Sequence, residues 1–125
     1  MSTFKRGTNF PNEGFIQKSI ETYFKEYGYT LLNVDLVDLA CQKCSEKWFI
    51  EAKGHTQGIG VDFNTGLGQI LKHMSDPACK YGIAVPKTDK FLFQINKVPK
   101  RVCSILNLHW ILVDEDGHLE FITPE

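Results

Sequence analysis

One short segment constrains the fold of this 125-residue chain more than any other, the run Trp48-Phe49-Ile50-Glu51-Ala52-Lys53-Gly54. It begins with aromatic and β-branched residues, which is typical of a buried strand, and a glycine marks its end. Because side chains alternate along a strand, Glu51 and Lys53 project from the same face, about 7 Å apart. The segment predicts a strand whose end directs a carboxylate and an ammonium group at one spot.

A second apolar run, Leu31 to Ala40, carries Asp35 and Asp38 among residues that favour strands. An acid inside such a strand costs free energy unless a cation meets it. Metal-dependent hydrolysis of a phosphodiester requires two carboxylates that hold Mg²⁺ and a lysine that helps to activate water or offsets the charge of the phosphate. The two runs together indicate this chemistry.

The size and composition of the chain indicate a single domain, residues 1–125. Hydrophobic residues make up 42% of the sequence, which is enough for one core. The first residues contain no apolar signal core, and the longest apolar runs are far below the roughly 20 residues of a membrane-spanning helix. We expect a soluble, cytoplasmic protein without a membrane partner.

The charge balance limits how the chain meets nucleic acid. Its formal net charge is -1, so contact with a polyanion requires a local basic patch. One candidate is a cluster of basic residues with a single acid among them, Lys87, Lys90, Lys97, Lys100 and Arg101. A solvated helical face is the alternative interpretation of this cluster.

The four cysteines give a weaker signal. Cys41 and Cys44 have metal-like spacing, but no second pair of ligands follows at the spacing of a zinc site. Free thiols are expected in a reducing cytoplasm, and metal binding by this pair stays open.

Hydrophobic periodicity predicts a mixture of helices and strands. An amphipathic helix is expected at Glu13 to Tyr27, ending at Gly28, and a second helix at about Thr65 to Met74. Another helical stretch, broken at Pro99, ends at Leu106. The expected strands are Tyr29 to Ala40, Lys47 to Lys53, Tyr81 to Pro86, His109 to Val113 and His118 to Ile122. Asp116-Gly117 supplies the turn of a C-terminal hairpin.

This order of elements and motifs resembles the restriction-endonuclease-like, or PD-(D/E)xK, nuclease superfamily over nearly the whole chain. The residues that carry the resemblance are Asp35 or Asp38, then Glu51-Ala52-Lys53, then Gln69. The segment Thr65 to Lys72, with its glutamine, is similar to the Holliday-junction-resolvase-like and Mrr-like branches. The resemblance implies an α/β fold with an αβββαβ core, in which helices flank a central mixed sheet, and a C-terminal hairpin.

Two pairings of the first hairpin are compatible with the sequence. If Asp38 faces Glu51, the turn centres between Cys44 and Ser45, and if Asp35 does, the turn lies earlier. We favour Asp35, because its apolar flanks resemble the apolar-Asp-apolar-apolar strand of the superfamily and the whole polar loop then lies outside the sheet.

The resemblance implies a metal site and roles for the residues around it. Asp35 and Glu51, with the backbone carbonyl of Ala52, would bind one Mg²⁺, for which Mn²⁺ would substitute. Lys53 would lie beside the attacking water and the scissile phosphate, and Gln69 would orient one of them.

Other residues are expected at the margins of this site. Lys72 is a candidate phosphate contact, and Lys87 and Lys90 are candidate DNA contacts from the basic cluster. Gln17 stands where related nucleases carry an additional acid on the first helix, so its part in the metal site stays open.

The function implied is a Mg²⁺-dependent endonuclease that hydrolyses phosphodiester bonds in DNA, in defence, repair or recombination. The alternative is a catalytically weak or inactive nucleic-acid-binding module on the same fold, and a third interpretation gives the acids and the lysine only a structural role. Cutting both strands needs two sites, so we expect a homodimer, with exposed aromatics near Phe91 and Phe93 as its candidate interface. A domain of this size has little surface for reading sequence, so a separate specificity subunit is a further expected partner.

Overall fold

The structure is a computed structural model that describes residues 7–55 and 58–125. Within these residues the chain forms four helices and six strands. The helices are α1 (Glu13–Glu26), α2 (Ile59–Leu71), α3 (Asp89–Asn96) and α4 (Lys100–Leu106). The strands are β1 (Thr30–Leu32), β2 (Leu39–Lys43), β3 (Glu46–Ala52), β4 (Lys80–Pro86), β5 (Leu108–Val113) and β6 (Leu119–Ile122).

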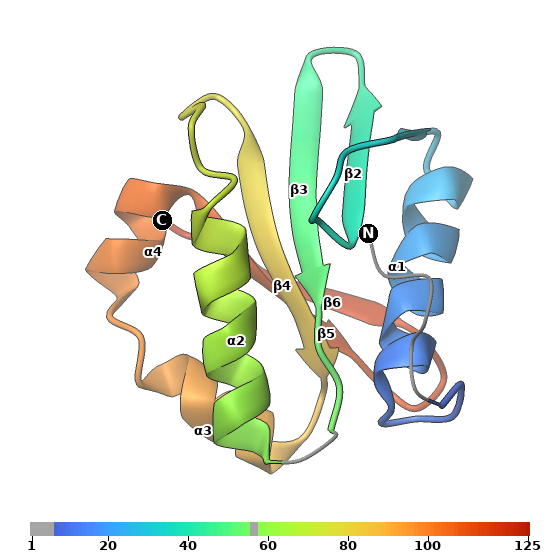
Figure 1. Cartoon of the computed structure of the whole chain (residues 1–125), viewed down its shortest axis with the longest axis vertical. Helices are drawn as coiled ribbons and strands as arrows, with labels where there is room; N and C mark the ends of the chain where they lie inside the picture. The colour runs from blue at the N-terminus through green and yellow to red at the C-terminus, as the bar shows by residue number, and fades with distance from the viewer. Residues whose placement is uncertain (1–6, 56–57) are drawn as a thin grey trace.

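The strands form one sheet in the order in which they occur along the chain (Figure 1). β1, β2 and β3 form an antiparallel meander, β4 and β5 continue the sheet in parallel with β3, and β6 pairs antiparallel with β5. Each parallel step requires a crossover. α2 makes the crossover from β3 to β4, and α3 with α4 makes the one from β4 to β5. The carboxyl end of β3 therefore leads directly into the segment that precedes α2.

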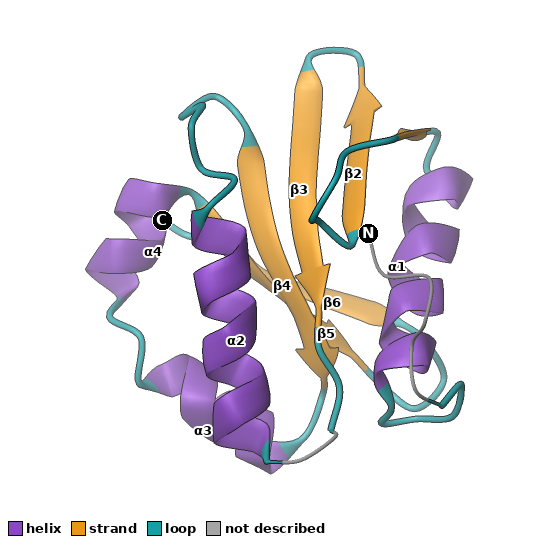
Figure 2. Ribbon diagram, viewed as in Figure 1, coloured by secondary structure: helices purple, strands orange, loops and turns teal. Residues whose placement is uncertain are grey.

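Helices cover both faces of the sheet and create two apolar cores (Figure 2). α1 covers one face through side chains spaced four residues apart, Ile16, Ile20 and Phe24, which lie on one side of the helix. The other face is covered by α2, α3 and α4 through Phe63, Ile70, Phe91, Ile95 and Cys103. In the described part of the chain, none of the helices has the length and apolar character needed to span a membrane.

The predicted fold class is confirmed. The order α1, β1, β2, β3, α2, β4 is the αβββαβ core of the restriction-endonuclease-like fold, and β5 with β6 forms the expected C-terminal hairpin.

Three expectations about local structure were wrong. The run predicted as one strand, Tyr29 to Ala40, is two strands, because a turn at residues 33–38 separates β1 from β2. α2 begins at Ile59, before the predicted Thr65, since the buried Phe63 anchors its first turns despite the glycines around it. Phe91 is buried in the core, so of the two aromatics proposed for a dimer interface only Phe93 is exposed.

Candidate functional site

The alternation of side chains along β3 directs Glu51 at α2. Trp48, Ile50 and Ala52 belong to the core beneath α1, whereas Phe49 packs against the core beneath α2. Glu51 shares the face of Phe49 and is 2% exposed. The apolar run that makes β3 a central strand therefore also buries Glu51 between the sheet and α2.

The register of β2 and β3 places Asp38 opposite Glu51. The pairs Leu39↔Ile50 and Lys43↔Glu46 continue outward to Asp38 and Glu51, and the turn centres between Cys44 and Ser45. The Asp38 carboxylate accepts a hydrogen bond from the backbone N–H of Ala52, with 2.8 Å between Oδ2 and N. The two carboxylates are thus on neighbouring strand ends.

The preference for Asp35 as the residue facing Glu51 was wrong. Asp35 is exposed in the turn that separates β1 from β2. The reason is the tight connection between β2 and β3, which consists of Cys44 and Ser45 alone. Cys44 adopts a left-handed backbone with φ 54°, and this permits a turn centred between these two residues.

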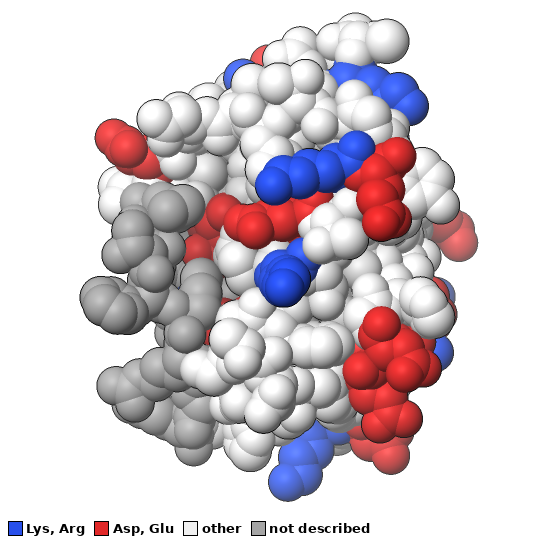
Figure 3. All heavy atoms as spheres, turned by 90° about the vertical axis from the view of Figure 1, so that its right-hand side faces the viewer, with Lys and Arg blue, Asp and Glu red and all other residues white. Residues whose placement is uncertain are grey.

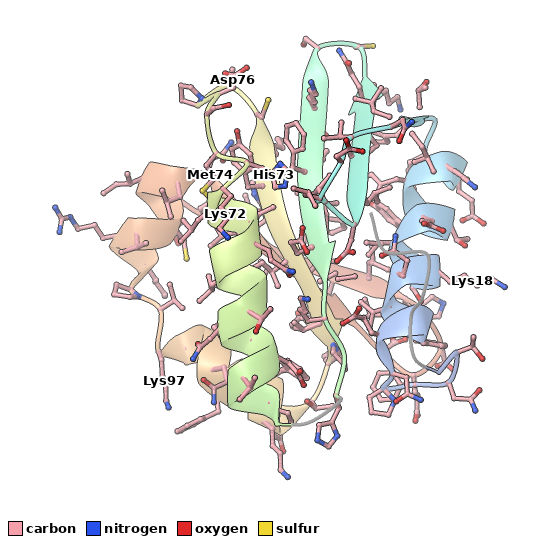
Figure 4. The ribbon with its side chains drawn as sticks, in the orientation of Figure 1. Lys18, Lys72, His73, Met74, Asp76 and Lys97 are labelled. Carbon is pink, nitrogen blue, oxygen red and sulfur yellow. The ribbon has the colours of Figure 1, made fainter. Side chains whose placement is uncertain are left out.

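A cavity of about 470 Å³ opens beside these carboxylates. Its floor and walls come from the turn before β2, the end of β3 and the last turns of α2: Leu36, Val37, Asp38, Glu51, Gln69, Lys72 and His73. Figure 4 shows Lys72 and His73 at the carboxyl end of α2. Gln69 and Lys72 are three residues apart on this helix and line the same cavity, as their spacing predicts.

Lys53 comes directly after the last residue of β3 and lies against α2 at Gly66. A Cβ atom built on Gly66 would lie 3.0 Å from Cγ of Lys53 and 3.7 Å from its Cε, so the lysine stem occupies the space that the missing side chain leaves. The Lys53 backbone N–H donates to the carbonyl of Ala84 on β4 at 2.9 Å, which fixes the base of the side chain. Lys53 is half-buried against α2, where Gly66 makes room for it, and it is not among the residues that line the cavity.

Hydrogen bonds from both sides hold the turn that carries Asp38. His73 Nε2 donates to the carbonyl of Leu36 at 2.8 Å, and the His73 ring stacks on Phe49 with 5.9 Å between centroids. From α1, the Gln17 amide donates to the carbonyl of Asp38 at 2.9 Å. Gln17, the residue left open on the first helix, therefore supports the backbone of Asp38. His73 and Leu36 were missed, because a histidine next to a helix end and a leucine in an apolar run carry no sequence signal of a site.

The other predicted substrate contacts lie apart from the cavity. The Lys87 ammonium is 2.8 Å from the Glu120 carboxylate of β6, and this ion pair raises the pKa of Lys87. Lys90 lines a separate hollow of about 290 Å³ on α3, beside Asp89, Phe93 and Gln94. On the side of the molecule shown in Figure 3, acidic and basic side chains lie next to one another. Of the three predicted lysines, the structure brings Lys72 to the carboxylates.

The donors at the cavity fit a hard cation such as Mg²⁺. Asp38 and Glu51 offer carboxylate oxygens, and the side-chain carbonyl of Gln69 is buried and accepts no hydrogen bond within residues 7–55 and 58–125. Oxygen ligands are those that Mg²⁺ prefers, and an ion with few protein ligands keeps several waters. Glu51 is buried, and a cation bound beside it would lower the free energy of its charged form.

A second group of metal-type side chains lies in the β5–β6 turn. The ligand atoms of Asp114, Asp116 and His118 are within 4.8 Å of one another. The backbone N–H groups of His118 and Asp116 donate to the Asp114 carboxylate at 2.9 Å and lower its pKa. This geometry is that of an aspartate that stabilises a turn.

Two solved structures share this fold. An XisH family protein from Nostoc punctiforme has a TM-score of 0.65 at 18% identity, with 86% of this chain and 98% of that chain covered. A fdxN element excision controlling factor protein from Anabaena variabilis has a TM-score of 0.64 at 19% identity, with 88% and 99% covered. No family model and no curated protein matches the chain. At these identities the likeness concerns the fold.

Proposed function

We propose that this chain is a Mg²⁺-dependent endonuclease that hydrolyses phosphodiester bonds in DNA. The observation that carries the proposal is the shared cavity of Asp38 and Glu51 with Gln69 and Lys72, at the end of the strand that continues into Lys53. Carboxylates on adjacent strand ends and cations at the rim match what hydrolysis of a charged phosphate requires. In this proposal Asp38 takes the role that the sequence had assigned to Asp35.

Each residue has a role that follows from its position. Asp38 and Glu51 hold the metal ion, with the carbonyl of Ala52 as the remaining ligand expected from the motif. When bound, Mg²⁺ supplies a water of lowered pKa and positive charge next to the phosphate. The stem of Lys53 lies against Gly66, and its ammonium group is assigned the role of offsetting charge on the phosphate. Gln69 orients the water or a phosphate oxygen through its amide.

Lys72 is the candidate anchor for the DNA backbone. It is exposed at the cavity rim, and an ammonium group binds a phosphate as a point charge. With a net charge of -1, the chain gains little affinity from its overall field, so binding depends on such local contacts and weakens steeply with salt.

The two fold neighbours suggest a biological setting. One of them controls excision of the fdxN element by its own description, and both are similar to this chain over almost their whole length. We therefore place the proposed cleavage in DNA recombination or excision. The catalytically inactive DNA-binding module is the competing function.

The test is cleavage of a panel of DNA substrates in Mg²⁺ and in Mn²⁺: supercoiled plasmid, linear duplex, single strand and branched junction. Glu51→Gln, Lys53→Ala and Gln69→Ala should each lose at least about tenfold in rate, with Glu51→Gln the most impaired. Glu51→Gln should also weaken Mn²⁺ binding, measured by electron paramagnetic resonance without DNA.

Two matched variants control for general effects of charge removal. Glu120→Gln removes a carboxylate from an exposed ion pair, and Lys18→Ala removes a lysine that projects from α1 away from the cavity (Figure 4). Both should cleave like the wild type. Binding of DNA without cleavage in either metal would favour the inactive module, and neither binding nor cleavage would refute both functions.

A further inference from the structure

Leu36 is an apolar residue at a position where a leucine adds little to the stability of the fold. It is 79% exposed at the rim of the cavity, so it contributes little to the core. Its backbone is left-handed, with φ 64°, a conformation that glycine and asparagine adopt readily and leucine does not. Neither burial nor backbone preference accounts for a leucine here, and such strained positions cluster at functional sites.

The position of Leu36 is held by the same groups that shape the cavity. Its carbonyl accepts the hydrogen bond from His73, whose ring is in turn stacked on Phe49 of β3. Two residues further along the chain, Asp38 is bonded to the end of the same strand. The leucine is therefore held at the rim of the cavity that Asp38, Glu51 and Lys72 also line.

We propose that Leu36 is an apolar wedge that contacts an unstacked base next to the scissile phosphate, so that the preferred substrate is DNA with an open base step, such as a bulge, a flap or a junction. This inference rests on the proposed function. Apolar side chains inserted at a base step replace stacking that the nucleic acid loses, and they favour DNA in which that stacking is already lost. In continuous duplex the wedge must first separate two stacked bases.

A protein partner on Leu36 is the competing explanation for an exposed leucine. Leu36, Asp38 and Glu51 line the same cavity. A protein bound on Leu36 would therefore cover the cavity rim and obstruct the access of a phosphate to the two carboxylates. A nucleic acid bound at these carboxylates would lie in the cavity that Leu36 also lines. The placement of the leucine therefore favours a base over a second protein.

The experiment uses duplexes with 2-aminopurine at a single-nucleotide bulge and in a continuous helix, with Ca²⁺ in place of Mg²⁺ to separate binding from cleavage. Leu36→Asn removes the apolar group and relieves the backbone, so the variant should fold at least as well as the wild type. Leu36→Met keeps an apolar side chain of similar reach, and Leu71→Gln removes an exposed leucine from α2 outside the cavity.

We expect the wild type to bind the bulged duplex more tightly than the continuous one and to raise 2-aminopurine fluorescence. Leu36→Asn should reduce this preference about tenfold, whereas Leu36→Met and Leu71→Gln should keep it. An unchanged preference in Leu36→Asn, with DNA still bound, would overturn the wedge and leave the nuclease proposal intact. Loss of self-association in Leu36→Asn with unchanged DNA preference would assign the leucine to a protein contact and also overturn it. If the wild type binds no DNA, the proposed function fails, and the wedge with it.

Discussion

Gly66 and Gly68 lie two residues apart in α2 and offer a matched test of how Lys53 is positioned. A Cβ at Gly68 would meet nothing within 4 Å, whereas a Cβ at Gly66 would lie 3.0 Å from Cγ of Lys53 and 3.7 Å from Cγ2 of Ile83. Both glycines are inside the helix, so replacement by alanine gives the same gain in helix propensity, about 1 kcal/mol. A difference between the two variants therefore reports the contacts that a side chain at position 66 makes, of which the one with Lys53 is the tightest.

The magnitudes follow from these distances. Gly68→Ala should stabilise the protein by about 1 kcal/mol, which corresponds to a rise in Tm of about 4 °C for a domain of this size. In Gly66→Ala, carbon atoms normally separated by about 3.5 Å or more would start at 3.0 Å, so the lysine stem must move by about 0.5 Å. An off-rotamer side chain costs about 1 kcal/mol, which offsets the gain in propensity and leaves stability close to that of the wild type.

Cleavage should be unchanged in Gly68→Ala and slower in Gly66→Ala. A displaced ammonium group offsets phosphate charge less well, and an error of a fraction of an ångström lowers the rate about tenfold. Chemical denaturation measures the stabilities, and single-turnover cleavage at saturating Mg²⁺ measures the rates, with Gly68→Ala as the control. Equal stabilisation by both substitutions, with full cleavage by both, would show that Lys53 does not pack on Gly66 and would refute the reasoning.

Three further predictions concern the fold and its response to solution conditions. Gly54→Ala should destabilise the protein by about 2 kcal/mol in urea unfolding, because its Cβ would lie 2.6 Å from the backbone carbonyl carbon of Asn12; wild-type stability would contradict this contact. The Tyr29 hydroxyl and Lys80 hold the pKa of Glu46 at about 2, below its ordinary 4.5, so Glu46 stabilises the fold above pH 4.5 and this contribution is lost as the pH falls toward 2. Because 35% of this side chain is exposed, we expect about 1 kcal/mol, measured as the stability gap between wild type and Glu46→Gln at pH 7 that closes near pH 2. Removal of Mg²⁺ with EDTA should abolish cleavage but leave the circular dichroism spectrum unchanged, since two apolar cores hold the sheet; unfolding would indicate a structural metal.

The sequence was sufficient for the fold because its strongest signals were periodic. The spacing of Ile16, Ile20 and Phe24 predicts α1, and the apolar run of β3 with its Glu-x-Lys end predicts a central strand. The start of α2 was predicted less well, since glycines favour loops locally, whereas burial of Phe63 against the sheet stabilises a helix there.

The sequence predicts which site residues lie together when those residues come from the same helix or strand. Glu51 lies on β3 and Lys53 directly after it, and Gln69 lies in the last turn of α2 with Lys72 directly after it. Alternation and helical spacing are therefore enough to group each pair. The choice between Asp35 and Asp38 depends on the pairing of two strands, which one turn residue with a left-handed backbone determines. Residue type alone carries no signal of such a turn at Cys44, nor of the exposed backbone kink at Leu36.

The most direct test of the account compares Asp38→Asn with Asp35→Asn in Mg²⁺-dependent cleavage of the DNA panel. The two substitutions change net charge equally and lie three residues apart, but only Asp38 lines the cavity with Glu51. We predict that Asp35→Asn cleaves at the wild-type rate and that Asp38→Asn loses about 100-fold or more. Cleavage by Asp38→Asn at the wild-type rate, with loss confined to Asp35→Asn, would contradict the account.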